Sequence, residues 1–239
     1  MPPRFFSELP ITDDSLTIQG DEVKHIVGAH RLGRDDEIVL FDGSGKEFLA
    51  KIEETQKKSI SVSIIERRSI SRELPFQLAL AVALPKGDRQ KVLVEKLVEL
   101  GVSTLIPLNC KRSVAIASEK SVERLHRRVI EASKQCGRNL LMQIQTPSTL
   151  QELSSSVSGA RFIAHPYDGQ LVSSEAISKL ANEPIAVAVG PEGGFTDEEV
   201  ELAMQTGWKS LVLGQSILRV ETAAVCAAAL FGIGRLTGD

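Results

Sequence analysis

GPEGGFTDEEVELA at 190–203 and LGQSILRVETAAVCAAA at 213–229 are the stretches that decide the fold. Each follows a short apolar run, at 185–189 or 211–213, turns on a glycine and enters a segment rich in helix-forming residues. The pattern therefore predicts strand, loop and helix, twice. In open α/β sheets ligands bind beyond the carboxyl ends of the strands, so the two loops predict one shared small-molecule pocket.

The first loop is rich in glycine and leads into a well-specified helix start. Gly193 and Gly194 permit a positive φ and allow a ligand to approach the main chain closely. Thr196 and Glu199 have the spacing of a capping box, within an acidic first turn that suits the positive end of the helix dipole. Because these acids would repel a phosphate, we expect a ligand that is not chiefly an anion. Taken alone, the loop is equally compatible with a plain glycine turn before a capped helix.

The second loop carries two opposite charges. Arg219 and Glu221 flank Val220, directly before an almost wholly apolar helix at 222–231. Charges at such a junction commonly form only a solvated ion pair. Beside a second ligand-binding loop, however, they become candidates for a reactive site.

The remainder of the chain shows two different patterns of predicted secondary structure. Before residue 75 a hairpin at 38–52, a strand at 59–65 and a helix at 21–32 predict a small β-barrel, with a boundary in the basic run at 67–72. Alternating strands and helices follow and imply a mostly parallel sheet covered on both faces. We expect strands at 76–84, 104–108, 161–164, 185–189 and 210–213, and helices at 88–100, 121–136, 173–181, 197–206 and 221–236.

The 239 residues carry a net charge of −3, but the charge is distributed unevenly. Residues 86–138 contain 12 Lys and Arg against 6 Asp and Glu, whereas residues 139–239 contain 5 against 11. A basic band in an otherwise acidic chain favours phosphate binding, although solvated helix faces would have the same composition.

Cysteine and histidine spacing predicts neither a disulfide framework nor a metal site. Cys110, Cys136 and Cys226 are odd in number and far apart, and the four histidines are scattered. No apolar run is long enough to span a bilayer and the N-terminus does not resemble a signal peptide, so we expect a cytoplasmic protein.

Together these residues resemble the SPOUT class of RNA methyltransferases, and more narrowly the 16S rRNA uracil-N3 methyltransferase family. Ala29 and His30, before Arg31, depart from the family pattern. The resemblance extends over nearly the whole chain and includes RFF at 4–6, FDGSGKEF at 41–48, LPKGDR at 84–89, EKLVELGV at 95–102, IPL at 106–108, KRSV at 111–114 and EASKQCGRN at 131–139.

The resemblance implies a PUA-like RNA-binding β-barrel at 1–72 and a SPOUT-like methyltransferase domain at 73–239, whose mostly parallel α/β sheet is knotted. It also implies S-adenosylmethionine as the cofactor, ribosomal RNA or the small ribosomal subunit as the partner, and a homodimer without a metal. The expected reaction is methylation at N3 of a uridine in 16S rRNA.

The family's functional residues transfer to this chain by position. Arg219 is the candidate for stabilising negative charge on the uracil oxygens as the N3 proton leaves, and Glu221 the candidate for orienting it. No residue is identified as the general base. RNA contacts are expected at Arg4, Arg31, Lys86, Arg89, Arg112 and Arg138. Cofactor contacts are expected at Ala164, His165, Gly190, Pro191, Glu192, Gly193, Gly194, Leu213, Gly214, Ser216, Ile217 and Leu218.

Other functions stay compatible with the sequence. The chain could be a SPOUT methyltransferase that acts on a different RNA, or a noncatalytic RNA-binding ribosome-assembly protein that has kept the fold. The second alternative predicts RNA binding without affinity for S-adenosylmethionine. A nucleotide-phosphate enzyme is less consistent with the sequence, because neither loop offers a lysine to a phosphate.

Overall fold

The computed structural model describes residues 2–114, 119–166, 177, 180 and 183–236. The chain forms two compact units, one of residues 1–73 with 133–141 and one of residues 74–132 with 142–239. Residues 133–141 lie far along the sequence from the rest of the first unit, and the expected division at residue 72 did not include them.

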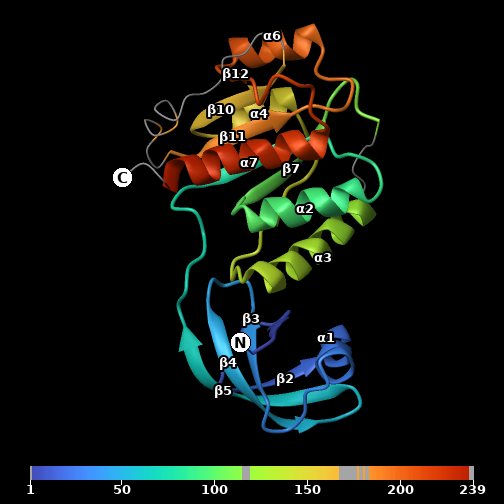
Figure 1. Ribbon diagram of the computed structural model, residues 1–239, viewed down its shortest axis with the longest axis vertical. Coiled ribbons are helices and arrows are strands. Elements are labelled where there is room, and N and C mark those ends of the chain that lie inside the picture. Colours follow the sequence, from blue (N-terminus) through green and yellow to red (C-terminus); the bar gives the residue numbers. More distant parts are fainter. Residues whose placement is uncertain (1, 115–118, 167–176, 178–179, 181–182, 237–239) are drawn as a thin grey trace. The chain divides into compact units, whose positions relative to one another are not determined.

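The first unit is built on a five-stranded sheet in the order β1-β3-β4-β5-β2 (Figure 1). The expected hairpin is present: β3 and β4 pair antiparallel, and Gly43 and Gly45 in the turn have φ of 82° and 88°. Its core contains Phe5, Ile38 and Phe48, each at most 2% exposed. The strands are β1 Arg4–Phe6, β2 Ser15–Gln19, β3 Glu37–Phe41, β4 Glu47–Thr55 and β5 Ser59–Arg68.

The expected helix at 21–32 is shorter and less regular than its sequence suggests. The segment begins as the short helix α1, Asp21–Val23, and continues as a π-helix, η1, Lys24–Ala29. Ile26 is fully buried in the core of the unit. Arg31 then adopts a left-handed φ of 56°, which ends the helix before residue 32.

The second unit contains a seven-stranded sheet in the order β12-β10-β11-β6-β7-β8, with β9 paired to β7. Every pairing within it is parallel. The five expected strands are present. The strands β8 and β9 were not expected, because two residues are too few to show the alternation of polar and apolar residues that identifies a strand. The strands are β6 Leu78–Val82, β7 Thr104–Asn109, β8 Gln143–Ile144, β9 Ser148–Thr149, β10 Ala160–Ala164, β11 Ile185–Val189 and β12 Lys209–Leu211.

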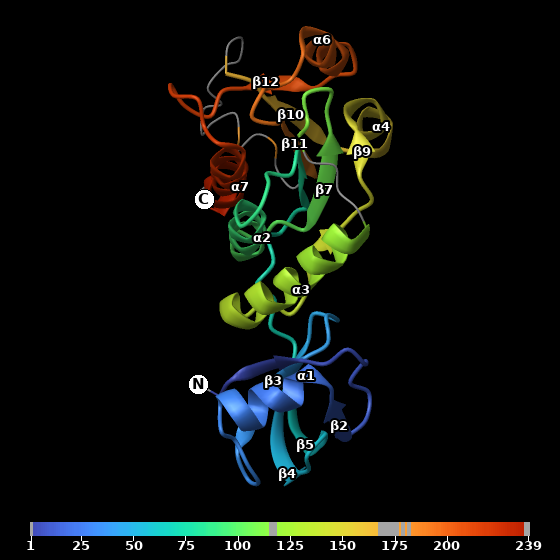
Figure 2. The ribbon, with the colours of Figure 1, turned by 90° about the vertical axis from the view of Figure 1, so that its right-hand side faces the viewer.

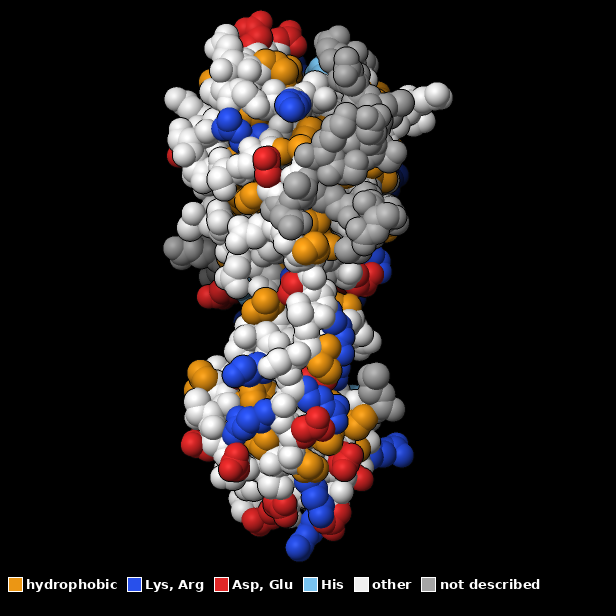
Figure 3. Space-filling model, turned by 90° about the vertical axis from the view of Figure 1, so that its left-hand side faces the viewer, with side chains coloured by type: hydrophobic (Ala, Val, Ile, Leu, Met, Phe, Trp, Pro, Cys, Tyr) orange, Lys and Arg blue, Asp and Glu red, His pale blue; other side chains and the backbone are white. Residues whose placement is uncertain are grey.

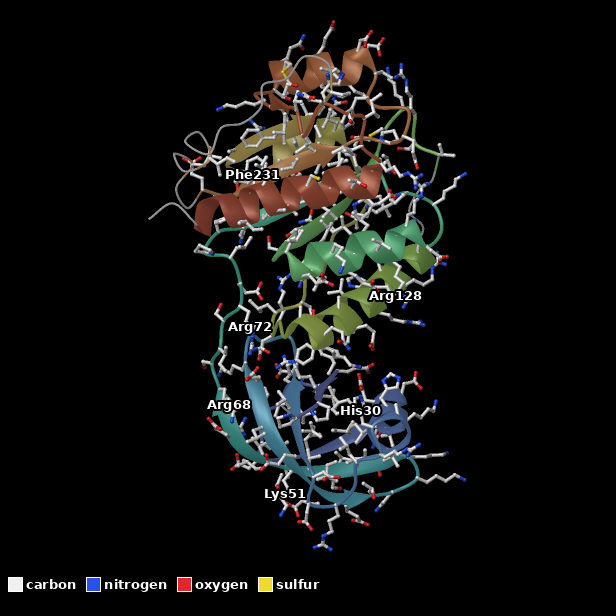
Figure 4. All side chains as sticks on the ribbon, viewed as in Figure 1. His30, Lys51, Arg68, Arg72, Arg128 and Phe231 are labelled. Atoms are coloured by element: carbon white, nitrogen blue, oxygen red, sulfur yellow. The ribbon has the colours of Figure 1, made fainter. Side chains whose placement is uncertain are left out.

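Helices cover both faces of this sheet, as its apolar strands require. The helices α2 and α7 lie side by side over one face, and α4 and α6 lie over the other (Figure 2). On the first face the ring of Phe231 on α7 packs against Phe162 of β10, with centroids 4.8 Å apart (Figure 4). The helices of this part of the chain are α2 Arg89–Glu99, α3 Glu119–Cys136, α4 Leu150–Ser156, α6 Asp197–Gln205 and α7 Val220–Leu236.

Four of the five expected helices are confirmed, and the fifth, at 173–181, lies largely outside the described residues. Helix α4 was not expected, although Thr149 and Glu152 form a capping box at its start. Gly101 and Gly207 have φ of 79° and 86°, as predicted for glycines that end α2 and α6. No helix among the described residues is long and apolar enough to cross a membrane.

The strand order places the two signature loops together. The strands β12, β10 and β11 are consecutive and parallel, so their carboxyl ends lie along one edge of the sheet. The segments that leave these ends begin after residues 211, 164 and 189. All three therefore meet at one place.

Candidate functional site

A cavity of about 290 Å³ opens where these three segments meet. Every residue expected to contact a cofactor, from Ala164 to Leu218, is in its wall. Sequence reasoning assigned no cavity role to the other wall residues, most of which lie next to expected ones at strand ends and helix starts. These others are Arg112, Pro166, Val189, Phe195, Asp197, Leu211, Val220 and Ala223.

The loop after β11 is a tight turn. The Gly194 amide donates to the Pro191 carbonyl at 2.8 Å. Gly194 has a φ of 68°, and a Cβ added there would meet open space. Gly193 keeps an ordinary φ, and its Cβ would lie 3.4 Å from the Arg112 side chain. Positive φ was expected to be useful at both glycines, but only Gly194 adopts it.

The start of α6 is tied to a second segment. The Thr196 and Glu199 capping box forms as predicted, with the Thr196 amide donating to Glu199 Oε2 at 2.8 Å. Glu199 Oε1 also accepts from the Lys111 amide at 2.9 Å. One carboxylate therefore joins the segment after β7 to the helix that follows the glycine loop.

Arg112 lies in the cavity wall and holds the glycine loop. Its Nη1 donates to the carbonyl of Gly193 at 2.9 Å and to that of Phe195 at 3.3 Å. The expected RNA contact at Arg112 stays a prediction. Its observed hydrogen bonds give it a direct part in shaping the cavity.

Arg89 connects both signature loops through their acidic residues. Its Nη2 lies 2.9 Å from Glu192 Oε1, and its Nη1 lies 3.7 Å from Glu221 Oε2. Glu221 was expected to orient Arg219, but its ion pair is with Arg89.

Arg219 has different surroundings. It lies between Leu218 and Val220, which both line the cavity, and its own side chain is exposed. Among the described residues it has no side-chain hydrogen bond or ion pair. Its charge is therefore available to a ligand.

Two expected RNA contacts, Arg4 and Arg138, are largely or fully buried in ion pairs within the first unit. Arg4 donates to Glu47 and to Asn139 Oδ1, each at 2.7 Å. The side chain of Arg138 is 4% exposed and pairs with Glu73. Removing a buried charge from its partner is costly, so these positions favour a structural role over phosphate binding. Neither position stood out from exposed arginines in the sequence, because its partner is distant along the chain.

The other expected RNA contacts and much of the basic band are accessible. Arg31 and Lys86 are exposed, as are Arg124, Arg127 and Arg128 on α3. Arg128 is labelled in Figure 4. On the face drawn in Figure 3, basic and acidic side chains of the first unit are interspersed. Arg124, Arg127 and Arg128 lie within five residues of one another on α3, although Glu123 and Glu131 are also exposed on this helix.

Cys110 lies near the site but is not a candidate nucleophile. Burial, with the nearby Glu199 carboxylate, raises the pKa of its thiol to about 12. The reactive form of cysteine is the thiolate, so Cys110 is unreactive near neutral pH.

Comparisons with known proteins agree with this geometry. The RNA methyltransferase domain family matches residues 72–232, and the RNA methyltransferase PUA domain matches residues 18–65. The chain is 31% identical over 223 residues to ribosomal RNA small subunit methyltransferase E of Synechocystis, covering 92% of this chain and 73% of that one. It is 35% identical to the Rickettsia conorii protein of the same name, covering 87% and 84%.

Solved structures show the same fold. The ribosomal RNA small subunit methyltransferase E of Neisseria gonorrhoeae, bound to S-adenosylmethionine, is 27% identical with a TM-score of 0.89, and the match covers 98% of both chains. A Legionella pneumophila protein, solved with its bound cofactor S-adenosylmethionine, is 29% identical with a TM-score of 0.90 and the same coverage. The expected fold class, a SPOUT-like sheet with a small PUA-like domain, is confirmed. The chain therefore belongs to the RNA methyltransferase family, among the ribosomal RNA small subunit methyltransferases E.

Proposed function

We propose that this protein is an S-adenosylmethionine-dependent methyltransferase that modifies small-subunit ribosomal RNA at N3 of a uridine. The observation that carries the proposal is that one cavity, at the ends of β10, β11 and β12, contains all the expected cofactor residues in its wall. Its volume is near the lower end of the range for small-molecule pockets, about 300 to 1,000 Å³.

The wall has the chemistry that an adenosine and a methionine chain need. Leu211, Leu213 and Leu218 supply apolar surface, while Gly194 and Gly214 leave open space where a Cβ would stand. Asp197 and Glu192 add negative charge that suits a cationic sulfonium and ammonium. The acidic wall also supports the expectation that the ligand is not chiefly an anion.

When bound, S-adenosylmethionine supplies a methyl group whose bond to sulfur breaks as the bond to N3 forms, with the electron pair passing to sulfur. The chain must hold the two reactants in line and assist loss of the N3 proton. Arg219 is proposed to stabilise the negative charge that this loss places on the uracil oxygens. Its position beside the cavity, exposed and without a side-chain partner in the described part of the chain, supports that role.

Calorimetry with the cofactor and nucleoside mass spectrometry of rRNA test the proposal. The purified protein should bind S-adenosylmethionine, and small-subunit rRNA from cells without the gene should gain one N3-methyluridine on incubation with protein and cofactor. Binding of RNA without cofactor affinity would instead favour a noncatalytic assembly protein. Methylation of another RNA alone would overturn the substrate assignment.

Gly194→Val places a branched side chain in the proposed pocket and should abolish cofactor binding in a folded protein. The matched control is Gly20→Val, because Gly20 has a φ of 78° and equally open surroundings in the first unit. Both variants carry similar backbone strain, so only the pocket distinguishes them. Equal affinity in the two variants would remove the glycine loop from the cofactor site.

We also propose a homodimer, the usual state of the family that the sequence resembles. The alanine-rich face of α7 does not by itself support it, because Ala224, Ala227 and Ala228 are fully buried within their own chain. Ile233 on the same helix is 55% exposed and is free to meet a second copy. Light scattering at micromolar concentration should give twice the chain mass, and a monomer would contradict the proposal.

A further inference from the structure

Three segments that are distant in the sequence meet at one guanidinium group. Arg89 is the first residue of α2, Glu192 is in the glycine loop after β11, and Glu221 is in the first turn of α7. The Arg89 nitrogens lie 2.9 Å from Glu192 and 3.7 Å from Glu221. A guanidinium suits this bridge because its nitrogens are held in one rigid plane.

The Glu221 side chain depends on this neighbour. It is 12% exposed, and its Oε2 is buried and forms no hydrogen bond with any residue that the structure describes. A buried carboxylate needs a compensating charge, and Arg89 is its ion-pair partner among the described residues. The amino-terminal end of α7 contributes further positive potential.

The base of the bridge is rigid. On α2, Leu93, Val94, Leu97 and Val98 are fully buried, and α2 packs along α7. Arg89 therefore projects from a fixed helix, whereas Glu192 belongs to the glycine loop of the cavity and Glu221 follows the cavity residue Val220 at the start of α7.

We infer that Arg89 is a positioning residue that couples the proposed cofactor loop to the segment carrying Arg219. Through Glu192 it holds the glycine loop, and through Glu221 it holds the start of α7, two residues beyond Arg219. This role rests on the proposed function. It differs from the RNA contact expected at Arg89, because both of its observed partners are acidic groups of its own chain.

The two ion pairs of Arg89, here called the arm to the glycine loop (with Glu192) and the arm to α7 (with Glu221), predict different effects on cofactor affinity and on reaction rate. Glu192→Gln weakens the arm to the glycine loop and should lower S-adenosylmethionine affinity, measured without RNA, about fivefold. Glu221→Gln weakens the arm to α7 and should lower the single-turnover rate about tenfold at saturating cofactor and RNA. Arg89→Met removes both arms and should show both losses, with little added by combining it with either glutamine variant.

Lys91→Met is the matched control. Lys91 is an exposed cation on the same helix, and its ion pair with Glu95 is 3.8 Å long and stays within α2. The control should retain wild-type cofactor affinity and wild-type rate at saturating RNA. Circular dichroism and melting temperature confirm that each variant is folded.

The outcomes separate this inference from the proposed function. If wild-type protein binds no S-adenosylmethionine, the proposed function fails and the inference fails with it. If wild type binds but Arg89→Met keeps full affinity and recovers full rate at saturating RNA, Arg89 is an RNA contact and the inference alone is overturned. Should Arg89→Met not fold, the two glutamine variants carry the test, and wild-type behaviour in both would overturn the coupling.

Discussion

Arg219 and Glu221 are two positions apart in the chain, yet their side chains have opposite surroundings. Arg219 is exposed and unpaired among the described residues, whereas Glu221 is 12% exposed and lies beside Arg89. The free cation is the one that can meet charge developing on a substrate. The buried acid is fixed within the protein itself.

Arg219→Ala should lower the single-turnover methylation rate about 10²-fold at saturating RNA and cofactor. The reason is that loss of one donor to an oxyanion-like group costs transition-state stabilisation without changing ground-state binding. Rapid-quench measurement of methyl transfer gives this rate directly.

The control for Arg219 is Lys209→Ala, which removes an exposed cation from β12, the strand that leads into the same loop. It should leave the rate unchanged. Recovery of full activity in Arg219→Ala by excess RNA would show that Arg219 binds substrate and does not stabilise the transition state.

At the scale of elements, helix α6 depends on one carboxylate. Glu199 accepts from the Thr196 amide at 2.8 Å and from the Lys111 amide at 2.9 Å. The first contact caps the helix, and the second fixes the segment that carries Arg112. A single side chain thus joins a local signal, the capping box, to a long-range contact that the sequence does not reveal.

Glu199→Ala should lower the free energy of unfolding by about 1 to 2 kcal/mol, because two backbone donors lose their acceptor. It should also weaken cofactor binding, since the loop before α6 and the Lys111 segment both border the cavity. Urea denaturation followed by the fluorescence of Trp208, the sole tryptophan, measures the first effect, and calorimetry measures the second.

Glu201→Ala is the control on the same helix, because Glu201 is exposed and has no side-chain partner among the described residues. It should change neither quantity beyond a few tenths of a kcal/mol in unfolding free energy. Equal destabilisation by both variants would show that helix propensity, and not the bridging contact, accounts for the effect.

At the scale of the whole molecule, the first unit is completed by residues 133–141, which come from the middle of the chain. Charged groups help to join these segments. Glu47 Oε2 accepts from Arg4 at 2.7 Å and from Arg72 at 3.2 Å, and Arg72 also donates to the Gly137 carbonyl (Figure 4). The side chains of Glu47 and Arg4 are 5% and 11% exposed, whereas Arg72, at 36%, reaches the surface.

Acid should unfold the first unit through Glu47. Burial alone would raise the pKa of Glu47, but hydrogen bonds from Arg4 and Arg72 outweigh it and hold the pKa below its ordinary value. A carboxyl with a lowered folded-state pKa stabilises the fold above its unfolded pKa, roughly 4.3, and loses that contribution as pH falls through the folded value. Hydrogen exchange of β3 and β4 amides between pH 7 and pH 3 should therefore show protection falling in acid.

Glu47→Gln should remove much of this pH dependence and cost about 3 kcal/mol at pH 7, because Arg4 loses its buried partner. Glu66→Gln is the control. Its hydrogen bond from Arg68 lowers the pKa of Glu66 in a similar way, but the pair is exposed and screened by water. An unchanged acid profile in Glu47→Gln would assign the transition to other carboxyls.

The sequence by itself determined the features that depend only on residues close together in the chain. The signature loops, the capping box of α6, the glycines that end α2 and α6 and the longer strands all follow from residues within a few positions of one another. Family resemblance added the cofactor and the class of fold. Because the three strand ends are adjacent and parallel, the fold gathers at one cavity every cofactor residue that the resemblance implied.

Only the tertiary structure decided which charges meet. The contacts of Arg4 and Arg138, the attachment of residues 133–141 to the first unit and the bridge from Arg89 to Glu192 and Glu221 join positions between 43 and 135 residues apart. The two-residue strands β8 and β9 likewise exist only because β7 is beside them. An arginine has the same local sequence preferences whether it meets water, a phosphate or a distant carboxylate, so its partner is set by the packing of the whole chain.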